Sequence, residues 1–185
     1  MRNISLADDV AAMRASCADP EEFVRVFELH FDEVHRFVAA RVGADAADDV
    51  TSDTFTVAFR RRERFDATGG EVRPWLLGIA LNVMRNHHRA RRRWYGFLAH
   101  LRPDPPEDAT GELDARVDAA AAGERINAAL GRLRTGDREV FLLAACGELT
   151  YPQIATALGI PVGTVRSRMH RARAALRADL EELTR

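Results

Sequence analysis

The sequence is poor in several features that define other classes of protein. Its two cysteines, Cys17 and Cys146, lie far apart and neither belongs to a C-x-x-C pair, so neither a disulfide framework nor a zinc site is expected. No apolar run approaches the ~20 residues that a membrane span needs, and residues 1–10 lack the apolar stretch of a signal peptide. We therefore expect a cytoplasmic protein without a metal or a cofactor.

Sheet-forming and catalytic signals are scarce too. Aromatic residues make up only 7% of the chain while alanine is abundant, which favours helices over sheets. The G-x-S-x-G, P-loop and G-x-G-x-x-G motifs are absent. His87 and His88 are adjacent and would not face one site on a helix, and no carboxylate or cysteine stands at ligand spacing beside them. These absences predict an all-helical protein that is not an enzyme.

The net charge of −1 hides a strong segregation of charge. The chain has no lysine, so its basic residues other than histidine are arginines, which suit bidentate contact with phosphate or guanine. Residues 72–103 hold seven arginines and no acid, and residues 149–178 hold five arginines and no acid. Between them, residues 104–124 hold seven acids and one arginine. The pattern predicts two segments that bind nucleic acid, joined by a flexible acidic linker over about 97–122.

The N-terminal half has the pattern of a small helical bundle. Apolar residues recur at spacings of three and four, and acidic residues or prolines mark the helix starts. Helices are predicted over about 20–43, 45–64 and 73–95, with glycines between them. We expect these helices to form one domain over 20–96, preceded by an N-terminal extension of residues 1–19.

The C-terminal part, 123–185, has the signature of a helix-turn-helix. Thr150 and Gln153 form a capping-box pair, so a short helix should begin at the residue after Thr150. Gly159 ends this helix, and another begins near Val162 after about three residues. The order of helix, glycine-containing turn and helix is typical of DNA-binding domains.

The helix from Val162 has two different sides. Val165 and Met169 lie on an apolar side that would pack on the preceding helices. An arginine-rich helix can be only a solvated face, but the capping box and turn in front of it favour DNA binding. Residues facing away from the apolar side are expected to read bases, and those at its margins to contact phosphates: Thr164, Ser167, His170 and Arg171 for the bases, Arg166 and Arg168 for the backbone.

Two blocks of residues together resemble a known family. Residues 48–55 (DDVTSDTF) and 73–82 (RPWLLGIALN) resemble sigma region 2. Residues 149–155 (LTYPQIA) and 158–168 (LGIPVGTVRSR) resemble sigma region 4. The chain is thus similar to the extracytoplasmic-function (ECF) group of bacterial RNA polymerase sigma factors. The resemblance implies an all-helical protein of two domains that binds core RNA polymerase, directs it to promoters and melts the DNA.

The resemblance also implies roles for single residues. In the family, one helix of region 2 docks on core polymerase, its last helix and the preceding loop handle the melted −10 element, and region 4 reads the −35 duplex. Many members are held inactive by an anti-sigma factor, so we expect such a partner. The expected residues are Asp48, Asp49, Ser52, Asp53 and Phe55 for core polymerase, and Phe65, Arg73, Trp75, Asn82, Arg85 and Arg89 for the −10 element.

Two other functions compete with this one. A stand-alone helix-turn-helix repressor or activator would bind duplex DNA without polymerase, usually as a dimer on a palindrome. The region 2 block argues against it, since such a regulator needs no melting domain. A third hypothesis makes the N-terminal helices an enzyme or a ligand-sensing domain, and the missing catalytic motifs argue against that.

Overall fold

A computed structural model describes residues 6–66, 70–101 and 128–183, and within these ranges the protein is built from helices without a strand. The all-helical fold class expected from the composition is therefore confirmed. The predicted linker over 97–122 lies largely outside the described residues. The N-terminal helices are α1 (Leu6–Ala18), α2 (Phe23–Val42), α3 (Ala44–Arg61) and α4 (Val72–Leu101), with two short 3₁₀ turns, η1 (Pro20–Glu22) and η2 (Arg62–Arg64).

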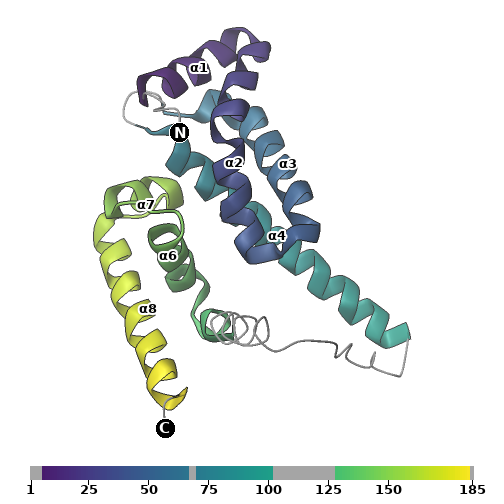
Figure 1. Cartoon of the computed structure of the whole chain (residues 1–185), viewed down its shortest axis with the longest axis vertical. Coiled ribbons are helices and arrows are strands. Elements are labelled where there is room, and N and C mark those ends of the chain that lie inside the picture. Colours follow the sequence, from purple (N-terminus) through teal and green to yellow (C-terminus); the bar gives the residue numbers. More distant parts are fainter. Residues whose placement is uncertain (1–5, 67–69, 102–127, 184–185) are drawn as a thin grey trace, which may run out of the picture.

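Helix α1 was not predicted by the sequence, which suggested only an extension over residues 1–19. It packs against α2 and η2 (Figure 1). Ala12 and Met13 are each 1% exposed, so the helix belongs to the hydrophobic core. Its Asp9 carboxylate pairs with His30 of α2 at 3.2 Å, and both side chains are buried.

The other N-terminal helices lie close to their predicted positions. Asp19 caps η1 by accepting a hydrogen bond from the Glu21 N–H, and Gly43 separates α2 from α3 with a φ of 82°. Helix α3 ends slightly earlier than expected, because its predicted last turn is the 3₁₀ turn η2. Helix α4 continues past the expected end near Tyr95 to Leu101.

The C-terminal elements are a helical stretch at residues 128–132, then α6 (Thr135–Ala145), α7 (Tyr151–Leu158) and α8 (Val162–Leu183). Helices α7 and α8 begin at the predicted residues. The Gln153 side chain accepts a hydrogen bond from the Thr150 backbone N–H at 2.8 Å, as the capping box requires. Gly159 takes a left-handed conformation with a φ of 62°, which ends α7 and starts the turn.

The two helical groups pack against each other through α4 and α7 (Figure 1). Gly78 of α4 lies so close to α7 that a Cβ at this position would clash with the carbonyl oxygen of Ala157. Leu76 and Leu77 of α4 belong to the same buried cluster as Ile154 of α7. The described residues of both halves therefore share one hydrophobic core.

Candidate nucleic-acid interface

Helix α8 presents the two sides that its sequence predicts. Val165, Met169 and Ala172 are at most 2% exposed and hold the helix against α6 and α7. Ser167 and His170 are exposed, whereas Thr164 is half-buried. Of the two predicted backbone-binding arginines, Arg166 is exposed, while Arg168 is half-buried against Gly136 at the start of α6.

The Arg171 guanidinium is held from the side by a buried carboxylate. Its Nε donates to Asp137 Oδ2 at 3.1 Å and its Nη2 donates to Asp137 Oδ1 at 2.8 Å. Asp137 lies on α6 and is only 5% exposed. The hydrogen bonds with Asp137 raise the pKa of Arg171 above its ordinary value. The pair engages the edge formed by Nε and Nη2, so the donors of Nη1 take no part in it.

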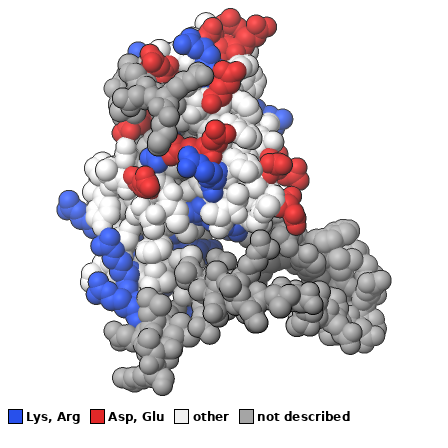
Figure 2. Space-filling model, viewed as in Figure 1, with Lys and Arg blue, Asp and Glu red and all other residues white. Residues whose placement is uncertain are grey.

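A basic groove runs between α7 and α8. Tyr151 lies on the α7 side, and the α8 side carries arginines and His170. Figure 2 shows blue arginine side chains along the left edge of this face, over α8, while red carboxylates lie mainly toward the top and right. The sequence did not point to Tyr151 or Arg177, although their helical positions beside the predicted readers could have done so. The groove residues are Tyr151, Arg166, Met169, His170, Arg173, Ala174 and Arg177.

The predicted −10 residues on α4 lie on its exposed side and partly against α6. Asn82 and Arg89 are exposed, as the helical spacing predicts. Arg85 is half-buried: it pairs with Glu139 of α6 at 3.0 Å and also donates to the Asn82 side-chain oxygen. The structure thus brings Asn82 and Arg85 together, and it uses Arg85 in the contact between the two halves.

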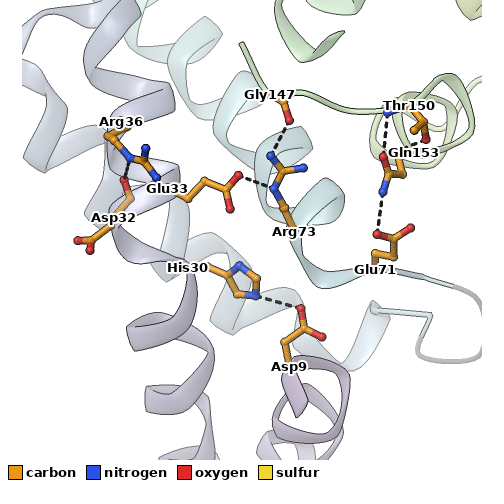
Figure 3. A network of polar contacts seen from close by, with 10 residues as sticks. All are labelled: Asp9, His30, Asp32, Glu33, Arg36, Glu71, Arg73, Gly147, Thr150 and Gln153. Atoms are coloured by element: carbon orange, nitrogen blue, oxygen red, sulfur yellow. Dashed lines mark hydrogen bonds and ion pairs between the residues drawn. The ribbon is translucent and has the colours of Figure 1, made fainter. Parts of the chain in front are cut away.

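Of three more predicted −10 residues, Arg73 and Trp75 lie in the first turn of α4 and Phe65 follows η2. Arg73 pairs with Glu33 of α2 and donates to the Gly147 carbonyl at 2.7 Å, as Figure 3 shows. The rings of Phe65 and Trp75 meet edge to face, with centroids 5.4 Å apart, and both are half-buried. Arg73 is therefore a bridge between α2 and the α6–α7 turn, whereas Phe65 and Trp75 form an aromatic pair that joins the end of η2 to the first turn of α4.

A polar contact next to Arg73 also joins the two halves. The Gln153 side chain donates to Glu71 at 2.8 Å while its oxygen caps α7 (Figure 3). On α2, burial lowers the pKa of Arg41, which lies against Cys146. Cys17 and Cys146 are free thiols and both are exposed.

Of the predicted polymerase-binding residues on α3, four are exposed at the surface and one is buried in the core. The acidic side chains and Ser52 are exposed, and Asp48 accepts a 3.0 Å hydrogen bond from His35. Phe55 is only 4% exposed and packs edge to face on Phe27, with ring centroids 4.9 Å apart. Phe27 is itself 38% exposed. The surface is thus an acidic helix beside an exposed aromatic ring. Its exposed members are Asp48, Asp49, Ser52 and Asp53.

Within residues 6–66, 70–101 and 128–183, no group of three or more histidine, cysteine or carboxylate side chains is placed to hold a metal ion. None of the helices in these ranges is both long enough and apolar enough to cross a membrane.

Comparisons with known proteins match both halves of the chain. Residues 26–94 match the family described as Sigma-70 region 2, and residues 123–176 match Sigma-70, region 4. The chain is 36% identical over 161 residues to the ECF RNA polymerase sigma factor SigC of Mycobacterium tuberculosis, covering 87% of this chain and 83% of that protein. It is 32% identical over 192 residues to the RNA polymerase sigma factor CnrH of Cupriavidus metallidurans, covering 95% of each.

A solved structure shows the same fold. The structure of CnrH in complex with the cytosolic domain of CnrY matches with a TM-score of 0.65 and 29% identity, covering 95% of this chain and 98% of that chain.

Proposed function

This chain belongs to the ECF group of bacterial RNA polymerase sigma factors, and we propose that its two basic helices divide promoter recognition between a closed duplex and an opened strand. As a sigma factor it acts in transcription initiation, with core RNA polymerase supplying the catalysis. The observation that carries the proposed division is the presence of two separate arginine-bearing surfaces, on α4 and on α8, in one chain. A domain over 20–96 and a domain over 123–185 would each carry one surface.

Helix α8 is proposed to read the −35 element in the major groove. Its exposed polar side and its buried side together fit a helix that lies in a groove while packed on α6 and α7. Asp137 would hold the Arg171 guanidinium at a fixed angle, so that the free edge can donate to a base or a phosphate. The groove with Tyr151, Arg173 and Arg177 would follow the backbone beside it.

Helix α4 and the segment before it are proposed to bind the opened −10 strand. Unstacked bases are bound by aromatic faces and polar side chains, with arginines along the phosphates. Phe65 and Trp75 supply the aromatic faces, and Asn82, Arg85 and Arg89 supply the polar and basic side. Because Arg85 is paired with Glu139, its use by DNA requires this ion pair to break.

Helix α3 and the exposed Phe27 are proposed to bind core polymerase. Exposed carboxylates beside an exposed aromatic ring suit a partner surface that is basic and apolar. Phe55 would act by packing under Phe27 and not by direct contact. A polymerase partner also places the protein in the cytoplasm.

An anti-sigma factor is the expected further partner. The solved relative CnrH is described in complex with the cytosolic domain of CnrY. We propose that a protein of this kind binds the present chain and competes with polymerase for the α3 surface.

The test of this function uses DNA with a −35 duplex joined to a single-stranded −10 element, and core polymerase loaded with the chain. Variants of α8 should reduce the effect of base substitutions in the −35 duplex on affinity, and variants of α4 should reduce the effect of substitutions in the −10 single strand. If variants of one helix alone reduced both effects, the proposed division would be overturned. A stand-alone repressor or activator would instead bind the intact duplex tightly in the absence of polymerase.

A further inference from the structure

We propose that the N-terminal helix α1, acting through Arg62, positions η2 and Phe65 for capture of the −10 strand; this rests on the proposed function of α4. Neither matched family region includes α1, because the region 2 match begins at residue 26. Arg62 is thus a positioning residue, and α1 is part of the −10 reader although it does not touch DNA.

The Arg62 side chain donates hydrogen bonds to the C-terminal ends of both α1 and α3. Its Nε donates to the Ser16 carbonyl in the last turn of α1 at 2.9 Å, and its Nη1 donates to the Phe59 carbonyl in the last turn of α3 at 2.8 Å. Carbonyls in a last turn lack the partner four residues on, and a cation is favoured there by the helix dipole. The Phe59 carbonyl also accepts the backbone N–H of Arg62, so backbone and side chain of one residue both bond to it. The guanidinium also lies 4.2 Å over the Phe59 ring. One side chain therefore joins α1 to α3.

The segment that Arg62 begins is the one that leads to the aromatic pair. The Phe65 backbone N–H donates to the Arg62 carbonyl at 3.1 Å, which closes η2. Phe65 then meets Trp75 edge to face, and Gly70 donates back to Asp66 at 2.9 Å. Movement of Arg62 would be transmitted through η2 to Phe65, because only three residues of a hydrogen-bonded turn lie between α3 and Phe65.

Helix α1 is anchored firmly enough to act as a support. Met13 is buried in the core, and Asp9 pairs with His30 about two turns away from Ser16 (Figure 3). The helix also packs directly against η2 and α4. Weakening the anchor at Asp9 should therefore loosen the Ser16 carbonyl that Arg62 binds, without changing any group near the −10 strand.

Arg62 is distinguished from the arginines next to it by its bonding. Its guanidinium donates to two carbonyls and stacks on a ring, whereas Arg61 and Arg64 are exposed. These bonds engage Nε and Nη1 of Arg62, which fixes the guanidinium between the two helix ends. Arg61 therefore offers a matched control, with the same charge at nearly the same place.

The experiment uses core polymerase loaded with the full chain and a −10 single strand joined to a −35 duplex. Discrimination is the ratio of affinities for the cognate −10 strand and for a strand with one base substituted. We expect Arg62→Ala to lower this ratio by about tenfold, the scale of one base contact, with Arg62→Lys intermediate and Arg61→Ala unchanged. Asp9→Ala should lower it too, while polymerase affinity and −35 discrimination stay at the wild-type level.

Three results would overturn the proposal. Unchanged −10 discrimination in Arg62→Ala would show that the segment needs no support from α1. An equal loss in Arg61→Ala would show that only the positive charge matters. A parallel loss of polymerase affinity and −35 discrimination would show a general effect on folding. If the wild-type complex itself fails to discriminate −10 strands, the proposed function of α4 fails instead.

Discussion

At the scale of single residues, three of the arginines predicted to contact DNA are paired with carboxylates. Asp137 holds Arg171, Glu139 holds Arg85 and Glu33 holds Arg73. Arginine presents its donors in a rigid plane, so fixing one edge fixes the direction of the other. Specific recognition by these side chains therefore depends on residues that need not touch DNA.

This dependence predicts the behaviour of the Asp137–Arg171 pair. Arg171→Ala should lower −35 discrimination about tenfold, as expected for one base contact. Asp137→Ala should produce a similar loss, because the free guanidinium is no longer oriented. The measurement is the ratio of affinities for cognate and substituted −35 duplexes, and the double variant should lower this ratio little more than either single variant does. Additive losses in the double variant would show that Asp137 and Arg171 act independently, which would contradict the prediction.

A second residue-scale prediction concerns the polymerase surface. Asp53→Arg should weaken core polymerase binding, because the exposed acidic side of α3 would lose its complementarity. Asp8→Arg, an equal charge change on the exposed side of α1, should leave the affinity unchanged. Titration of labelled core polymerase measures both, and equal weakening by the two variants would place the binding surface elsewhere.

At the scale of elements, the helix-turn-helix depends on the conformation of one glycine. Gly159 has a φ of 62°, which costs about 1 kcal/mol or more for a residue with a Cβ. Gly159→Ala should therefore lower the free energy of unfolding by about that amount in a denaturant titration. Gly163→Ala is the control, because this glycine is helical with open space around it and the change should be neutral or stabilising. If both variants changed the free energy of unfolding equally, the left-handed conformation of Gly159 would not be what stabilises the turn.

The elements also show what sequence reasoning can find. Helices α7 and α8 were predicted because Thr150, Gln153 and Gly159 are strong local signals. Helix α1 was missed because its buried side includes Asp9 and Ser16 among small residues, so its hydropathy has no clear stripe. Exposure of Ser167, His170 and Arg171 followed from the helical period, whereas Thr164 is half-buried. Asp137 lies 34 residues from Arg171, and no local pattern joins them.

At the scale of the whole molecule, the described structure is a closed form. The contact between α4 and α7 needs Gly78, and the Arg85–Glu139 pair extends it to α6. The same α4 is the proposed −10 reader. The free chain therefore uses Arg85 both in the contact between its halves and, as proposed, in binding DNA, so the two uses compete.

This competition predicts that opening the contact exposes the −10 surface. Gly78→Ala should separate α4 from α7, since its Cβ would clash with the Ala157 carbonyl. The radius of gyration in solution should increase, and the affinity of the free chain for a −10 single strand should rise by about tenfold or more, equal to at least ~1.4 kcal/mol. A variant with unchanged dimensions and unchanged affinity would contradict the closed form.

The central claim is that this chain gives core polymerase its promoter specificity through two readers. The most direct measurement is run-off transcription by core polymerase on a promoter library, with and without the chain. The account predicts transcripts that require the chain and start at promoters sharing both a −35 and a −10 element. Tight, sequence-specific binding of the free chain to duplex DNA with no stimulated transcription would contradict it.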